Sequence, residues 1–142
     1  SLYLVGPPGD ALTARRSVTL AQAAAAPVML PGRPHSVRTM VEDVCAERGL
    51  ALTLLCEIES LLAIKETVAA GCGYTIAGFD SVAHDVASGR LQAAPIREPA
   101  ISRLLVMTTG PKHSVTTAAR AIAGLITSVA AGLVQRGTWR AP

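Results

Sequence analysis

The chain has 142 residues, half of them hydrophobic, which is enough for one domain or two small lobes. Only 3% of the residues are aromatic, so the core is expected to consist of aliphatic side chains packed between helices and a sheet. Charged residues make up only 16%, which indicates apolar surface used for self-association. The net charge is +3, but the basic residues are too scattered along the chain to favour a surface that binds nucleic acid directly.

The three cysteines, Cys45, Cys56 and Cys72, have no spacing typical of a metal site. Two of them, Cys45 and Cys56, fall on apolar positions of predicted elements, so we expect buried, reduced thiols and a cytoplasmic location. No signal peptide opens the chain, and the longest uncharged run, 121–135, is too short and too mixed with Gly, Ser and Thr to span a bilayer. Because the chain starts inside an apolar run without an initiator Met, we expect it to be a piece of a longer protein.

The predicted elements begin with two short strands, 2–5 and 28–30, separated by an irregular stretch with a turn of helix near 20–22. Apolar spacing then predicts a helix from 37 to Gly49, a strand over 52–58, a helix over 61–70 capped by Ser60, and a strand over 74–77. The chain is completed by a short helix capped by Asp80 or Ser81, strands over 91–96 and 102–109, and a long helix that begins after Ser114.

Strands and helices alternate between residues 27 and 96, which predicts a mostly parallel sheet with helices on its faces. Ligands bind such sheets at the carboxyl ends of the strands. Those ends carry Pro31-Gly32-Arg33, Glu59-Ser60 and Ala77-Gly78.

The turn after the second strand is the strongest candidate for a binding site. Pro31 and Pro34 stiffen it, Gly32 permits a close bend, and a helix begins near Ser36. The free N–H groups of that helix and Arg33 together favour a carboxylate or phosphate. The alternative is that Ser36 or water caps the helix and Arg33 is simply solvated.

Other polar patterns do not indicate catalysis. Glu57 and Glu59 point to the same face of a strand, but a solvated or ion-paired strand end explains them better than acid–base chemistry. The Gly71-Cys72-Gly73 sequence follows a helix instead of a strand, which is the reverse of a dinucleotide-binding turn. No spacing joins the three histidines to the cysteines, so we predict no enzyme, no metal and no cofactor.

Five stretches in order, "LYLVGPPGD", "LPGRPHSVR", "CEIESLLAIKETVAAGCGYTI", "SGRLQAAPI" and "SRLLVMTT", resemble the effector-binding domain of LysR-type transcriptional regulators. The resemblance extends from about residue 2 to residue 134. It implies an α/β, periplasmic-binding-protein-like (type II) bilobal fold, with the second lobe complete and the first partial. Residues 1–19 would hold the end of the first lobe and a crossover strand, 20–98 the second lobe, and 99–142 the return crossover strand and the C-terminal helix of the first lobe.

The resemblance also implies a small inducer in the cleft between the lobes. The effector-binding residues carried over are Pro31, Gly32, Arg33, Pro34, Ser36, Glu59, Ser60, Gly73, Tyr74, Thr75 and Ile76. Members of this family often have Ser where Gly32 stands and Asp where Glu59 stands. The first departure removes a hydroxyl, and the second lengthens an acidic side chain by one methylene.

The function implied is sensing a small, anionic, carboxylate-like metabolite within a bacterial, cytoplasmic regulator. The regulator would form a dimer or tetramer, with Val37, Met40, Val41 and Val44 as one candidate interface, and would have no membrane partner. DNA would be bound only through an N-terminal helix-turn-helix that this chain does not contain. We also expect an exposed apolar sheet edge and helix face where the rest of the first lobe belongs. The alternatives are a solute-binding protein of the same fold and, less favoured, an enzyme on that fold.

Overall fold

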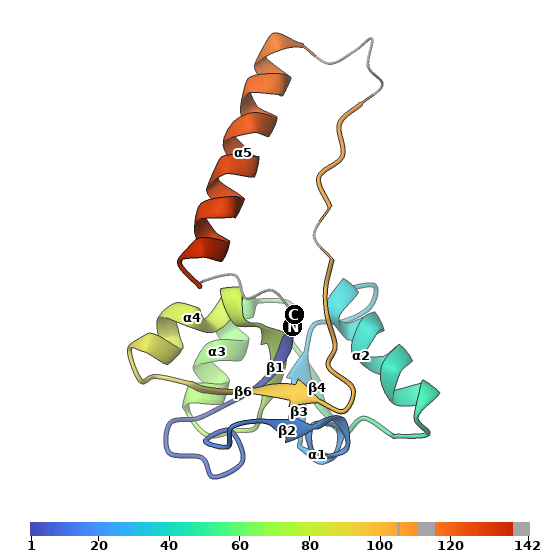
Figure 1. The fold of residues 1–142 in the computed structure, drawn as a ribbon. Coiled ribbons are helices and arrows are strands. Elements are labelled where there is room, and N and C mark those ends of the chain that lie inside the picture. Colours follow the sequence, from blue (N-terminus) through green and yellow to red (C-terminus); the bar gives the residue numbers. More distant parts are fainter. Residues whose placement is uncertain (105, 111–115, 138–142) are drawn as a thin grey trace.

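The computed structural model of the protein describes residues 1–104, 106–110 and 116–137. Residues up to Ile101 form an α/β body, and a helix near the C-terminus stands apart from it (Figure 1). Residues 102–104 and 106–110, which belong to no helix or strand, lead from the body toward that helix.

The larger sheet is built around the first strand. Strand β1 (Leu2–Gly6) lies in the order β2-β6-β1-β5, with β2 at Val18–Thr19, β5 at Thr75–Gly78 and β6 at Gln92–Arg97. β1 is antiparallel to both of its neighbours, whereas β2 and β6 are parallel. The parallel arrangement expected for residues 27–96 therefore does not extend to β1, because β1 precedes the alternating unit and no crossover helix fixes its direction.

A second, two-stranded sheet continues this layer. Strands β3 (Val28–Leu30) and β4 (Leu54–Glu57) are parallel, and the Met29 N–H donates to the Tyr74 carbonyl over 2.8 Å, beside a parallel bridge between Val28 and Tyr74. The carboxyl ends of β3, β4 and β5 therefore lie at one edge. β4 is shorter than the predicted strand and lies at the border of its sheet, so Cys56 is exposed and the prediction that it is buried was wrong.

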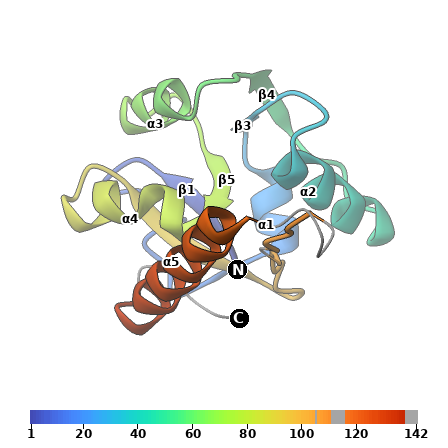
Figure 2. The same ribbon diagram turned by 90° about the horizontal axis from the view of Figure 1, so that it is seen from above.

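Helices cover both faces of the layer (Figure 2). Helices α1 (Leu20–Ala25) and α2 (Ser36–Glu47) pack on one face, where Leu2, Leu4 and Leu30 are buried. Helices α3 (Leu61–Ala69) and α4 (Phe79–Ala87) cover the other face, where Val5 and Met29 are buried. Successive residues of β1 thus point to opposite faces, and both faces are apolar because both are covered.

The ends of these helices follow the sequence signals in most places. Gly49 and Gly71 have φ of +66° and +80° after α2 and α3, as expected for C′ glycines, and Ser60 caps α3. Helix α4 differs: it begins at Phe79 after Gly78, without a side-chain cap, so the expected cap by Asp80 or Ser81 is wrong. Asp80 already lies in the first turn and its carboxylate faces Arg103.

The apolar face of α2 belongs to the core. Val37 and Val41 are buried, and Met40 and Val44 are partly buried against the same cluster. This stripe is therefore not free to form the dimer interface that was one candidate from the sequence.

The expected strand 102–109 is absent among the described residues, which exclude residue 105. Ile101 still pairs with β1, since the Leu2 N–H donates to its carbonyl over 2.8 Å, but residue 104 and residues 106–110 are exposed. No described strand lies beside this segment, and a strand without a partner leaves its backbone groups to water. Leu104 is 84% exposed and Val106 69%.

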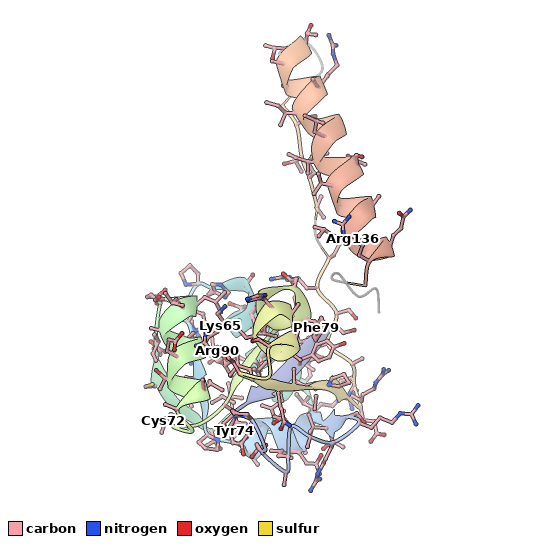
Figure 3. The ribbon with its side chains drawn as sticks, turned by 90° about the vertical axis from the view of Figure 1, so that its left-hand side faces the viewer. Lys65, Cys72, Tyr74, Phe79, Arg90 and Arg136 are labelled. Atoms are coloured by element: carbon pink, nitrogen blue, oxygen red, sulfur yellow. The ribbon has the colours of Figure 1, made fainter. Side chains whose placement is uncertain are left out.

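Helix α5 (Thr117–Gln135) carries a second exposed apolar surface, which stands apart from the body in Figures 1 and 3. Its cap is Thr116; the predicted cap, Ser114, lies outside the described residues. Leu125 is 66% and Val129 58% exposed, so the predicted apolar stripe exists, but no residue of α5 is buried. The whole of α5 has the length and mean hydropathy (1.6) of a membrane-crossing helix. One such helix is weak evidence for a membrane role.

Candidate functional site

A pocket of about 130 Å³ opens where β3, β4 and β5 end. Figure 2 looks onto this edge, with α2, α3 and α4 arranged around the strand ends. The residues that line the pocket are Pro31, His35, Val37, Glu59, Leu61, Thr75, Ile76, Ala77, Gly78, Ser81 and Arg103. Parallel strands bring their carboxyl ends to one edge, and the pocket lies at the edge where the sequence predicts a binding site.

Three strand–helix junctions supply almost the whole lining. The β3–α2 junction contributes His35, the β4–α3 junction contributes Glu59, and the β5–α4 junction contributes Gly78 and Ser81. Each junction ends at a helix N-terminus, where free N–H groups and the helix dipole favour negative charge. The pocket is therefore surrounded by three partial positive charges.

The three N-termini differ in whether a side chain caps them. His35 Nδ1 accepts from the Val37 N–H at 3.3 Å, and Ser60 Oγ accepts from the Ala63 N–H at 3.3 Å. Helix α4 has no side-chain cap. Helix α4 therefore differs from the other two helices in having no N-cap side chain that accepts from its first turn.

Two charged side chains of opposite sign line the pocket. Glu59 Oε1 accepts a hydrogen bond from the Gly32 N–H at 3.0 Å. Arg103, from the segment after β6, has its Nη2 at 3.3 Å from Asp80 Oδ2. Thr75 lies in the wall with only 2% of its surface exposed.

Four of the residues carried over from the resemblance line the pocket: Pro31, Glu59, Thr75 and Ile76. Gly32 contributes indirectly, because its N–H holds Glu59. Ser60 has its hydroxyl engaged as the cap of α3, and Ser36 is the first residue of α2.

The other carried-over residues lie outside the lining. Arg33 and Pro34 come directly after Gly32 in the same turn. The Arg33 guanidinium extends to Glu42, with Nη2 at 2.7 Å from Oε2. The Tyr74 hydroxyl donates to Asp10 Oδ1 at 2.7 Å, which fixes its ring beside the loop after β1. Gly73 lies against the chain at Pro27, with φ of +142° and 2.8 Å between the Pro27 carbonyl oxygen and the site of a Cβ.

Arg33 belongs to an ion-pair network on α2. Glu42 accepts from both Arg33 and Arg38, at 2.8 and 2.5 Å, and Arg38 Nη1 is 3.3 Å from Glu57. Burial would raise the pKa of Glu42, but its hydrogen bonds and charge interactions with the two arginines outweigh this and lower it. Glu57 is thus ion-paired, which agrees with the prediction that it is a solvated or ion-paired strand end instead of an acid–base catalyst.

Sequence reasoning missed several lining residues, above all Arg103, His35, Ser81 and Leu61. The sequence could have indicated three of them, His35, Leu61 and Ser81, because each lies within three residues of a strand-end stretch that was predicted to bind ligands. Arg103 had no such signal: it comes near the pocket because the Leu2 N–H pairs with the Ile101 carbonyl, a contact between the two ends of the body.

The chain matches the family model described as the LysR substrate binding domain over residues 1–131. It belongs to the LysR substrate-binding domain family. Among the described residues of this LysR domain, no three His, Cys, Asp or Glu side chains lie together as a metal site would require.

A curated relative is the HTH-type transcriptional regulator BbuR of Bordetella bronchiseptica, 28% identical over 138 residues. The match covers 97% of this LysR domain but only 42% of BbuR, so the chain spans about two fifths of that relative's length.

Solved LysR domains share the fold. The effector binding domain of QuiR in complex with shikimate superposes with a TM-score of 0.71 at 18% identity, covering 87% of this chain and 58% of that one. The regulatory domain of CcmR from Synechocystis PCC6803, in complex with 2-PG, gives 0.71 at 15% identity, covering 90% and 62%. These similarities confirm the expected periplasmic-binding-protein-like, type II architecture.

Proposed function

We propose that this chain is the effector-binding part of a LysR-type transcriptional regulator and that a small anion binds in the pocket at the ends of β3, β4 and β5. Family membership supports a regulatory role and supports no catalytic one. Solved domains of the same fold hold shikimate and 2-PG, which supports a small acidic ligand.

The observation that carries this proposal is the convergence of three helix N-termini on one pocket. Each N-terminus presents partial positive charge, and α4 has no side-chain cap. An anion is stabilised by such groups, typically by 0.3 to 1 kcal/mol for each helix at the surface and up to about 2 kcal/mol where partly buried. A neutral ligand gains little from them.

Binding would act by a population shift. Arg103 lies in the pocket wall and in the segment that leads to α5. A ligand that contacts Arg103 would therefore bind with different affinity when that segment takes different positions. We keep the proposed division into 1–19, 20–98 and 99–142, with the exposed apolar stripe of α5 covered by the remainder of the first lobe. The cytoplasmic location, the dimer or tetramer, and DNA binding through a helix-turn-helix outside this chain belong to the same proposal.

The test is binding without turnover. Thermal unfolding of the 142-residue chain should shift upward with small carboxylates and not with their neutral amides, since a ligand that binds only the folded state stabilises it. The carboxylate should be recovered unchanged. Deleting the coding region of the chain should then abolish the transcriptional response to the same compound; turnover of the compound, or an unaltered response, would contradict the proposal.

A further inference from the structure

The pocket lining includes two side chains of opposite charge, supplied by parts of the chain far apart in sequence. Arg103 follows β6, and Glu59 stands between β4 and α3. Apolar groups of Ile76, Ala77 and Leu61 belong to the same lining. A ligand that fits this lining must satisfy a cation and a carboxylate at once.

Glu59 is oriented but not neutralised. Its Oε1 accepts from the Gly32 N–H at 3.0 Å, and among the described residues no ion pair joins it to a basic side chain. A carboxylate has about four acceptor positions, so Glu59 retains free ones. A hydroxyl or an ammonium on the ligand satisfies them, whereas a second carboxylate is repelled.

Arg103 is held loosely. Its Nη2 lies 3.3 and 3.5 Å from the two Asp80 oxygens, while the surface pairs Arg33–Glu42 and Arg90–Glu66 both close to 2.7 Å. Charge-assisted N–H···O bonds are typically about 2.7 to 2.9 Å long. Arg103 has five donors in a planar fork, so most of its capacity remains for an incoming carboxylate.

We propose that the pocket binds a small carboxylate that carries a hydrogen-bond donor on its far side, with Arg103 gripping the carboxylate in place of Asp80 and Glu59 accepting from the donor. This assignment rests on the proposed function and names its ligand class. The volume of about 130 Å³ suits a single ring, since a cavity of roughly 150 Å³ in another protein accommodates benzene.

The probes are 3-hydroxybenzoate, benzoate and 3-hydroxybenzyl alcohol, which separate the carboxylate from the donor on one ring. Their dissociation constants for the full chain are measured by ligand-observed NMR. The expected order of affinity is hydroxybenzoate, then benzoate, then the alcohol. A zwitterionic probe, 3-(aminomethyl)benzoate, distinguishes an ammonium from a hydroxyl at Glu59.

The variants assign each end of the ligand. Arg103→Gln should weaken both carboxylates by about tenfold or more, and Arg103→Lys should restore part of the loss because it keeps the charge without the fork. Glu59→Gln should weaken 3-hydroxybenzoate by about fivefold while benzoate stays equal or tightens. Asp80→Asn should tighten both carboxylates by a few-fold, because it removes the competitor for Arg103.

Matched controls are Arg90→Gln and Glu66→Gln, which break a surface ion pair beyond the other end of α4 and should leave all three constants unchanged. Circular dichroism confirms that each variant is folded, and Asp80→Ser replaces Asp80→Asn if the latter is not.

Equal affinity for 3-hydroxybenzoate and benzoate, or dissociation constants that do not change in Arg103→Gln, would overturn the assignment while leaving the proposed function intact. A loss of affinity in Asp80→Asn would overturn the exchange of Asp80 for the ligand. If none of the probes nor any other small carboxylate binds, the proposed function itself fails.

Discussion

Gly32 holds the pocket residue Glu59: the Gly32 N–H donates to Glu59 Oε1 over 3.0 Å, and a Cβ on residue 32 would lie 2.7 Å from the same oxygen. The absence of a side chain at residue 32 is therefore what lets the Glu59 carboxylate lie against the turn.

Gly32→Ala should displace the Glu59 carboxylate at little cost to stability. The obstructing atom is the end of a flexible side chain, so the free energy of unfolding should change by less than about 1 kcal/mol. Binding of 3-hydroxybenzoate should weaken by a few-fold while binding of benzoate is retained. Urea denaturation and the NMR titration measure the two effects; a large loss of stability with intact binding would show that Gly32 serves the fold instead.

Asp85 should make the domain sensitive to acid. Its Oδ2 accepts from Lys65 Nζ at 2.7 Å and its side chain is 7% exposed; Figure 3 labels Lys65 and Arg90, which both pair with it. The hydrogen bond from Lys65 lowers the pKa of Asp85 against the opposing effect of burial, with the charges of Lys65, Arg90 and His84 adding to it.

Because the folded pKa of Asp85 is depressed, its contribution is fully present above its ordinary value and is lost as the pH falls through the folded value. The unfolding free energy of the native chain should therefore drop below about pH 4. Asp85→Asn should cost roughly 1 to 3 kcal/mol at neutral pH and flatten that drop. Denaturation at several pH values checks this, with the exposed Asp43→Asn as the matched control.

The core of the α/β body and the stripe on α5 should respond differently to the same truncation. Leu4 is fully buried between Ile76 and Ala94 in the central sheet, so Leu4→Ala should cost about 2 to 5 kcal/mol. Leu125 is 66% exposed, so Leu125→Ala should change stability by less than about 0.5 kcal/mol. A comparable loss in Leu125→Ala would show that the helix packs on another apolar surface in solution.

The three thiols should react in two classes. Burial raises the pKa of the Cys45 thiol, with the Glu42 charge adding to it, and the thiolate is the reactive form. Cys56 and Cys72 are exposed. Mass spectrometry after brief iodoacetamide treatment at neutral pH should find adducts on the latter two, and on Cys45 only in denaturant; early modification of Cys45 would contradict its burial.

Local patterns in the sequence determined most of the elements. Apolar spacing placed α2, α3 and α5, C′ glycines placed the ends at Gly49 and Gly71, and Ser60 marked the start of α3, because each of these signals acts within a few residues. The edge that carries the pocket also followed, since parallel strands joined by helices must end together. The motifs, read as a resemblance, indicated the family.

The tertiary structure decided which of those edge residues meet. Arg33 and Arg103 are equally basic in the sequence, but Glu42, nine residues after Arg33, draws its guanidinium onto α2, while the pairing of Leu2 with Ile101 brings Arg103 to the pocket. Cys56 and segment 102–109 were misjudged for a related reason: alternation does not reveal whether a strand has neighbours on both sides. Long-range pairing depends on contacts between residues far apart in sequence. The presence of Arg103 and Glu59 in one pocket lining therefore emerged only from the folded chain.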